Sequence, residues 1–594
     1  MLSLISSKVP VAAAFFLAAF CCAAYAGDGP AMGFRPSPVD FSPGRPKAAK
    51  RTLRLGAKSA DLPSKWDSRD HGWVSSVKNQ GSVGACWSFS ACAVIETQLL
   101  KAGRGEWNLS EKNMVNLHGF ELGPDDGGDN YLALAYLLRW AGAVAETNDV
   151  YARTLSAWTP SPRLAPALRV QKVVWIPGRG GPADNDALKG AIREYGAVST
   201  SIYWDFGREL GCNYYCGVSA YCNHAIAVVG WDDGYAASNF RDTPDGNGAW
   251  LIKNSWGTGR GAGGYYWVSY FDANFAIDEG AVFIPAAADD RYDAVYGYDV
   301  LGPMSVTSTS SMYTLEAAVF TSAWNEEIAA VGVFSNIDGN PYEISVYTNV
   351  ERTASTESPN PLRGGALACS TSGTVERMGY STIPLPNAVK VADGTSFAVV
   401  YEQKGRDRPH IFSRSMNFSD GTPYAVVNAE PGRTYWGYRF GASTNWIDLS
   451  TRSPGCVACL KAYTRSTVAS DSGPSETDDG TAALEWLAAT NATLFAETGE
   501  TFGAFAGLVG ANGRTLWTSW LAGFDPADAA DGEFEVEISV TNGKPSLVWR
   551  PDLGSSARTY TIYGTESLSP QNWQPVSDLA TTSAKFFKVS ISTR

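Results

Sequence analysis

Histidine is scarce in this chain, whose 594 residues include only His71, His118, His224 and His410. Any general base of the imidazole type must therefore be one of these four side chains. The sequence also lacks a glycine-rich phosphate loop, a basic stripe with interleaved aromatic residues, and convincing metal-ligand spacing. We therefore expect neither a cofactor nor a bound metal.

Basic residues are also fewer than acidic ones. The chain has 47 Lys and Arg against 60 Asp and Glu, a net charge of −13, which argues against nucleic acid or an anionic membrane as partner. Past residue 26 no stretch approaches 18 uninterrupted apolar residues, so no membrane span is expected there. Residues 1–26 differ: Lys8, an apolar core and the sequence AYA predict a secretory signal peptide cut after Ala26, with a retained anchor as the alternative.

The cysteine pattern agrees with export to an oxidising compartment. Beyond the predicted signal the cysteines are Cys86, Cys92, Cys212, Cys216, Cys222, Cys369, Cys456 and Cys459. We expect Cys92 to be a buried free thiol and the cluster at 212–222 to contain one disulfide. Zinc is the alternative for that cluster and for the CxxC pair at 456–459, but exported proteins pair thiols more often and no spare histidine is adjacent. A bridge from Cys369 to Cys456 or Cys459 is a further guess.

The segment VKNQGSVGACWSFSACAVIE at residues 77–96 has the form of a thiol nucleophile at the start of a helix. Small residues after Cys86 predict the helix, and a helix N-terminus favours the thiolate. Gln80 lies six residues upstream, beyond Gly81 and Gly84, and its amide could donate to a developing oxyanion. A lone cysteine before a helix is more often a core residue, so this hypothesis requires a base downstream.

His224 is the best candidate for that base. It opens NHAIAVVGWDD, an apolar run typical of a buried strand. His71 lies in a polar turn, His118 at the end of a predicted helix, and His410 in a separate region. Asn254 follows another apolar strand 30 residues after His224, and its carbonyl could accept the imidazole N–H and orient the ring. The order Cys, His, Asn at these separations fits the spacing rule for papain-like enzymes.

Together these residues resemble the papain family of cysteine peptidases. The resemblance implies that Cys86 is the nucleophile, that His224 is the general base and then the acid, and that Asn254 orients His224. It also implies that Gln80 and the backbone N–H of Cys86 form an oxyanion hole. Trp256 resembles the family's tryptophan that shields the His–Asn hydrogen bond from water.

Further matches extend the resemblance over about 180 residues. The motif LSE at 109–111 matches a family helix start, with its serine as the N-cap. Gly127 and Gly128 resemble the glycine pair whose backbone binds extended substrate by strand-like hydrogen bonds. Ser201 and Asn223 are our candidates for walls of the second subsite, and their polarity predicts a pocket that is not deep and apolar.

Two features depart from the family pattern. Val83 stands where the family usually has a second cysteine, so that disulfide is absent. Residues 27–60 are rich in Pro, Lys and Arg without helical periodicity, where the family usually has a longer helical inhibitor. PSPVDFS in this segment resembles a lead-in of bacterial members. The segment either lies in the cleft as an inhibitor or is merely a linker, and the catalytic domain is expected at 61–285.

The remaining residues suit a multidomain chain. Residues 286–465 contain short alternating runs split by turns, typical of an antiparallel β-sandwich, and resemble the lectin-like domain that follows bacterial papain-like peptidases. Residues 466–482 form an acidic linker. Residues 483–594 form a small β-rich module, in which Asp525 and Asp528 suit a solvated turn better than a calcium loop. The expected fold is an α+β papain-like catalytic domain, an all-β lectin-like sandwich and a small β-rich C-terminal module.

We therefore predict a secreted cysteine endopeptidase that hydrolyses peptide bonds through a Cys-His-Asn triad and an acyl-thioester intermediate. Its partners would be protein or peptide substrates. Carbohydrate binding, substrate docking and stabilisation of the catalytic domain are open roles for the lectin-like domain. A catalytically silent adhesion or glycan-binding protein is the alternative, and a transpeptidase is a third. The expected location is extracellular or periplasmic, with the bacterial cell envelope included.

Overall fold

The computed structural model describes residues 30–39, 62–164, 166–287, 292–308, 314–323, 325–352, 358–404, 409–440, 443–452 and 456–466, and strands between 535 and 593. The predicted signal peptide, most of the predicted linker, Asp525 and Asp528 lie outside the described residues. Among the described residues, no helix combines the length and the apolar character needed to cross a membrane.

The N-terminal half contains both helices and strands. Its helices are α1 (Cys86–Lys101), α2 (Glu111–Leu117), α3 (Asn130–Leu138) and α4 (Asp186–Tyr195). Its strands are β1 (Lys65–Asp67), β2 (Val170–Ile176), β3 (Val198–Ile202), β4 (Glu209–Leu210), β5 (Asn213–Tyr214), β6 (His224–Asp232), β7 (Ala249–Lys253), β8 (Tyr265–Ser269) and β9 (Gly280–Pro285). This mixture is the α+β fold expected for the catalytic domain.

Helix α1 lies at the centre of this half. Thirteen of its sixteen residues are buried, which is typical of a helix in an enclosed position. It packs against β3, β6 and β9 and contacts α2 and α3. The predicted helix start at Cys86 is confirmed, and its N-cap Ala85 makes no side-chain hydrogen bond, so no N-cap side chain occupies the first N–H groups of the helix. The predicted N-cap of α2 is confirmed too, because Ser110 accepts from the Asn113 N–H at 3.1 Å.

The next part of the chain consists almost entirely of strands. They are β10 (Ala294–Gly297), β11 (Ser305–Ser308), β12 (Thr314–Thr321), β13 (Glu326–Ser335), β14 (Asn340–Thr348), β15 (Ala366–Val375), β16 (Gly379–Val391), β17 (Ser396–Gln403), β18 (Pro409–Ser413), β19 (Met416–Asn417), β20 (Pro423–Ala425), β21 (Thr434–Phe440), β22 (Ser443–Asp448), β23 (Val457–Ala458) and β24 (Leu460–Ser466), with α5 (Leu449–Arg452) between β22 and β23.

These strands form the predicted sandwich. One layer is the sheet β15-β14-β17-β12-β21-β22, and the other contains β10-β24-β13-β16. Phe320 and Ile344 of the first layer and Val331 of the second share one apolar core, as expected for two packed sheets. The β-sandwich prediction is therefore confirmed.

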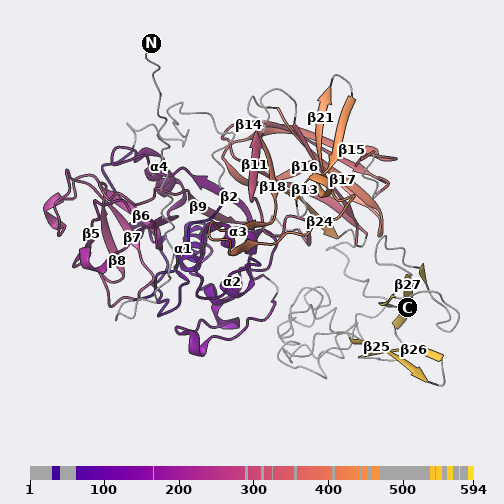
Figure 1. The fold of residues 1–594 in the computed structure, drawn as a ribbon, viewed down its shortest axis with the longest axis horizontal. Helices are drawn as coiled ribbons and strands as arrows, with labels where there is room; N and C mark the ends of the chain where they lie inside the picture. The colour runs from indigo at the N-terminus through magenta and orange to yellow at the C-terminus, as the bar shows by residue number, and fades with distance from the viewer. Residues whose placement is uncertain are drawn as a thin grey trace, which may run out of the picture.

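The two halves are joined by a shared sheet, which the sequence did not predict. The order β10-β24-β13-β16-β2-β9-β3-β6-β7-β8-β5-β4 is continuous, so the sandwich on the right of Figure 1 runs into the catalytic domain on the left. Strand β16 pairs with β2 through Gly379 opposite Val174. A Cβ at Gly379 would lie 2.0 Å from the Val173 carbonyl oxygen, so only glycine permits this approach.

The C-terminal region contains further antiparallel pairs. Strand β25 (Glu535–Thr541) pairs with β26 (Lys544–Arg550), and β27 (Arg558–Thr565) pairs with β28 (Gln574–Pro575) and β29 (Phe586–Thr593). The described part of the C-terminal region is therefore β-rich, as expected.

The cysteines differ from the disulfide predictions, because all eight in the described residues are free. Within the cluster at 212–222, the thiols of Cys216 and Cys222 donate to backbone carbonyls at 3.3 Å instead of pairing. Cys369 lies in the sandwich core, whereas Cys456 and Cys459 lie in two other apolar clusters, so packing keeps them apart. Among the described residues no group of three or more His, Cys, Asp or Glu side chains could hold a metal ion.

Candidate active site

The structure brings Cys86, His224 and Asn254 together at one place. Cys86 begins α1, His224 begins β6 and Asn254 directly follows β7. The Nε2 atom of His224 lies 2.8 Å from Oδ1 of Asn254, and the Ala225 N–H donates to the Cys86 sulfur at 3.3 Å. The other ring nitrogen of His224 is buried without a hydrogen-bond partner. A ring held through Nε2 therefore keeps Nδ1 free at the end of β6 that contacts the thiol.

Aromatic side chains enclose the imidazole. Trp256 is stacked on His224 with ring centroids 4.6 Å apart and is itself only 4% exposed. Trp204 packs edge-on against Trp256 at 5.0 Å and approaches His224 at 6.2 Å. Trp256 was anticipated from the sequence and Trp204 was not, because an aromatic residue after a strand is common in any core. The two rings exclude water from the His224–Asn254 hydrogen bond.

The Gln80 amide has a defined orientation. Its Oε1 accepts from the Ser255 hydroxyl at 2.5 Å, while its backbone N–H donates to the Ser255 carbonyl at 2.8 Å. Its Nε2 donates to the carbonyls of Val83 and Ala31, each at 3.0 Å. Ser255, which the sequence reasoning missed, therefore turns the NH₂ group of Gln80 toward the cleft.

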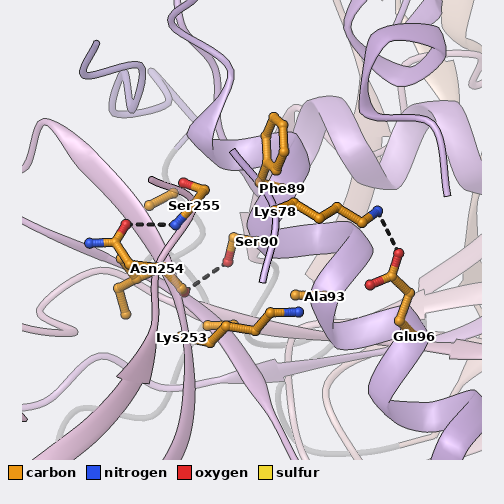
Figure 2. A pocket seen from close by; sticks show the side chains of 11 residues that line it. Lys78, Phe89, Ser90, Ala93, Glu96, Lys253, Asn254 and Ser255 are labelled. Carbon is orange, nitrogen blue, oxygen red and sulfur yellow. Dashed lines mark hydrogen bonds and ion pairs between the residues drawn. The ribbon is translucent and has the colours of Figure 1, made fainter. Parts of the chain in front are cut away.

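A buried polar network behind the site ties α1 to the strands that carry His224 and Asn254 (Figure 2). Lys78 donates to Glu96 and Glu111, each at 2.7 Å. Ser90 on α1 donates to the Ile226 carbonyl of β6 at 2.7 Å. The adjacent cavity of about 10 Å³ has room for at most one water molecule, so it is part of the support and not a ligand site.

The glycine pair presents its backbone to the cleft. The Gly128 N–H donates to the Gly33 carbonyl, and the Gly128 carbonyl accepts from the Arg35 N–H, both at 3.0 Å. Phe34 thereby forms a parallel bridge with Gly128. A Cβ at Gly128 would lie 2.7 Å from the indole nitrogen of Trp87, and Gly127 has a φ of 78°. Glycine is thus needed for this edge to bind extended chain.

The two candidate subsite walls occupy different positions. Asn223 contacts the chain in the cleft through its backbone carbonyl, which accepts from the Phe34 N–H at 3.0 Å. Its side chain instead bonds the Trp204 backbone. Ser201 is buried and donates to Asp278 at 2.7 Å. Their assignment to the second subsite stays a prediction.

Residues 30–39, here called the cleft segment, occupy the site. The Ala31 carbonyl accepts from Gln80 as described above, and the Gly33 N–H lies near the Cys86 thiol, where it lowers the pKa of that group. A Cβ at Gly33 would lie 2.0 Å from the Gly84 carbonyl carbon. Of the two readings of residues 27–60, these contacts favour a segment bound in the cleft over a linker.

With the segment bound, both reactive groups are held in their neutral forms. Burial raises the pKa of the Cys86 thiol to about 12, although backbone N–H groups oppose this. Burial lowers the pKa of His224 to about 4, against the hydrogen bond to Asn254. The physical cause is the same for both, because an enclosed site disfavours charge.

The other histidines lie elsewhere. His71 is stacked between Trp66 and Trp73, with ring centroids 4.4 and 4.7 Å away. The Nδ1 atom of His118 accepts from the Phe120 N–H at 3.0 Å. His410 is buried in the sandwich, stacked on a tryptophan ring. Of the four histidines, His224 is the one on a strand that contacts the Cys86 thiol, because β6 begins at His224 and the next residue donates its N–H to the sulfur.

Comparison with known proteins finds similarity to both domains of this chain. Residues 62–284 match the papain family of cysteine proteases, and residues 295–464 match the lectin like domain family. Cathepsin S of Mus musculus is 33% identical over 233 residues, 37% of this chain and 63% of that protein. The probable cysteine protease RD19C of Arabidopsis thaliana is 30% identical over 225 residues, 35% of this chain and 56% of that protein. The chain thus spans about three fifths of the length of these curated relatives.

Solved structures extend the likeness to both domains. The cysteine protease and lectin-like domains of Cwp84, a surface layer associated protein of Clostridium difficile, match with a TM-score of 0.60 and 26% identity, covering 74% of this chain and 93% of that chain. The clostridial cysteine protease Cwp84 after propeptide cleavage matches with a TM-score of 0.57 and 27% identity, covering 68% and 100%. With this fold and both domain matches, the chain contains a papain family cysteine protease domain at residues 62–284, followed by a lectin-like domain at residues 295–464.

Proposed function

We propose that this protein is a secreted cysteine endopeptidase that hydrolyses protein or peptide substrates through Cys86, His224 and Asn254. The observation that carries the proposal is the His224 ring, fixed through Nε2 by Asn254 at 2.8 Å with Nδ1 left without a partner. A ring held in this way can accept the thiol proton and later return it.

The reaction follows from these positions. Nδ1 of His224 removes the thiol proton, and the Cys86 sulfur attacks the carbonyl carbon of the scissile peptide bond. The resulting oxyanion accepts hydrogen bonds from Gln80 Nε2 and from the Cys86 backbone N–H. The amine leaves with the proton from His224, and the acyl thioester forms. Water, deprotonated by His224, then attacks the thioester and releases the acid and the thiol.

The cleft segment would inhibit this reaction. Its Ala31 carbonyl occupies the Gln80 donor, while the sulfur meets the N–H of Gly33, two residues away. The cleavage of a propeptide in the Cwp84 structure supports removal of a similar segment here.

The proposed location and partners follow from the likeness to known proteins and from the sequence. A cell-surface or extracellular site is supported by the likeness to Cwp84, a surface layer associated protein, and by the predicted signal peptide. A carbohydrate ligand is supported only by the match of residues 295–464 to a lectin like domain. Docking of the substrate and stabilisation of the catalytic domain stay open as alternative roles. A silent adhesion scaffold would have no need of a fixed imidazole beside a thiol.

A covalent label tests the peptidase directly. In the full chain carrying Gly33→Val, a change expected to displace the cleft segment, an epoxysuccinyl thiol-protease inhibitor is expected to add once, at Cys86, by intact-mass and peptide mass spectrometry. The adduct is expected to disappear in the additional His224→Ala variant, because the inhibitor requires an activated thiolate. Addition to folded protein that is independent of His224, or no addition at all, would exclude the proposed mechanism.

Acid is expected to open the cleft. The pKa of His224 is lowered to about 4 with the segment bound, whereas a solvated imidazole has about 6.5. Between these values the open state binds a proton that the closed state does not, so opening is favoured as pH falls, by about 1.4 kcal/mol per pH unit. Labelling of Cys86 in the wild-type chain by dipyridyl disulfide should therefore accelerate from pH 6.5 to 4. His224→Ala should remove this acceleration, and an unchanged profile would count against it.

A further inference from the structure

The lectin-like domain reaches the catalytic cleft through one hairpin. This 416–425 hairpin comprises β19, β20 and the turn between them. Tyr424 is completely buried, its carbonyl accepts from the Glu121 N–H at 3.0 Å, and its ring packs on Phe120 at 4.8 Å. Its hydroxyl donates to Asp129 at 3.0 Å. Asp129 caps α3 and directly follows the glycine pair, so the hairpin is anchored beside the edge that binds extended chain.

The turn of the hairpin is held in one conformation by its own hydrogen bonds. The Phe418 N–H donates to the Thr422 carbonyl at 2.8 Å, and the Thr422 N–H donates to the Asp420 carboxylate at 2.8 Å. Gly421 has a φ of 86°, which favours glycine. The Thr422 N–H holds the pKa of Asp420 below its usual value, so this carboxylate is charged at neutral pH.

A guanidinium group already occupies the space between Phe418 and Asp420. The Arg35 Cζ lies 3.5 Å from the centroid of the Phe418 ring, and its Nη2 lies 3.6 Å from the Asp420 carboxylate. Ser37 adds a hydrogen bond to the Tyr424 hydroxyl at 3.2 Å. An aromatic face together with a carboxylate is a recognition site for a cation.

The backbone of Arg35 relates this contact to the substrate register. Gly33 lies at the Cys86 sulfur, Phe34 lies opposite Gly128, and the Arg35 N–H bonds the Gly128 carbonyl. Counting outward from the thiol, the Arg35 side chain holds the third position. When the cleft segment leaves, Phe418 and Asp420 face an empty third position on the same cleft.

We propose that Phe418 and Asp420 of the lectin-like domain form a subsite for an arginine or lysine side chain at the third substrate residue before the scissile bond. The proposal deepens the proposed peptidase function and rests on it. The lectin-like domain thereby determines part of the peptidase specificity, and the substrate class is a protein or peptide with a basic residue at that position.

Four fluorogenic peptides test this subsite: acetyl-Xaa-Phe-Gly-aminomethylcoumarin with Xaa arginine, lysine, leucine or citrulline, the neutral isostere of arginine. The enzyme is the full chain carrying Gly33→Val, measured in parallel with wild-type chain from which residues 1–60 have been removed by proteolysis. We expect arginine to exceed citrulline in kcat/KM by about 3- to 30-fold, the range for one exposed ion pair and one cation–π contact. The difference should lie in KM, since the contact is remote from the reacting bond.

The variants separate this subsite from a general charge effect. Asp420→Asn should bring the arginine-to-citrulline ratio to within about twofold, and Phe418→Ala should lower it. Asp393→Asn, which removes an exposed carboxylate from the β16–β17 turn of the same domain, should leave the ratio unchanged. Hydrolysis without arginine preference, or a preference that survives Asp420→Asn, overturns the subsite alone. Failure to hydrolyse any of the four peptides overturns it together with the peptidase function.

Discussion

Replacement of His224 by alanine is expected to lower kcat/KM for peptide hydrolysis by at least about 10⁴-fold, the scale seen when a member of a nucleophile–base pair is removed. Without the imidazole, the Cys86 thiol has no acceptor for its proton. Initial rates with acetyl-Arg-Phe-Gly-aminomethylcoumarin, in the Gly33→Val background, measure the effect.

Asn254→Ala should lower kcat/KM by less, about 10²-fold, which is the scale expected for a misoriented catalytic group. The reason is that Trp256, stacked 4.6 Å from the ring, and Trp204 still restrict His224 after the hydrogen bond is lost. His71→Ala is the matched control, because His71 is stacked on tryptophan rings away from the cleft, and its rate should stay within twofold. Retention of more than a hundredth of the activity in His224→Ala would contradict its role as the base.

Gly33→Val in the otherwise unaltered chain is expected to activate it. The added Cβ would lie 2.0 Å from the Gly84 carbonyl carbon. Gly84 itself cannot easily retreat, because its N–H donates to Asp125 at 2.7 Å and α1 begins two residues later. The segment must therefore move. A clash of about 1–3 kcal/mol, the usual cost of overpacking, would raise the open population, and with it the rate of Cys86 labelling, by about 5- to 150-fold.

The control for this prediction lies in the same segment. Pro36 is exposed, so Pro36→Ala should leave the labelling rate of Cys86 near that of the wild type. Thermal unfolding of both variants would verify that the catalytic domain remains folded. An unchanged labelling rate in Gly33→Val would mean that the segment is not held by its contact with Gly84, and the inhibitory role would fail.

Several residues of the site carry a local signal in the amino-acid sequence. Cys86 is followed by small residues that favour a helix, and His224 opens an apolar run typical of a buried strand. Asn254 occurs at the matching point after the next apolar run. Ser110 is predicted as an N-cap by a three-residue motif, and it accepts the expected hydrogen bond. Such inferences succeed because capping and periodicity operate within a few residues along the chain.

Other features left no local signal. Trp204 and Ser255 are aromatic and polar residues of ordinary appearance, and their importance comes from neighbours brought close by folding. The disulfide within 212–222 was expected from composition, yet the thiols point to backbone carbonyls. Proximity along the chain therefore did not supply the geometry that a disulfide requires.

The sequence alone was sufficient for the order of domains, the family and the groups that meet at the thiol, because helix starts, strand periods and motif spacing are local properties. Only the tertiary structure revealed that β16 extends the catalytic sheet through Gly379, that Gly33 lies beside Cys86, and that a hairpin of the lectin-like domain contacts the cleft segment. The hydrogen bond between Asp129 and Tyr424 joins residues 295 positions apart. No periodicity encodes such a pairing, since it depends on how two whole sheets pack and on which backbone positions are free of side chains.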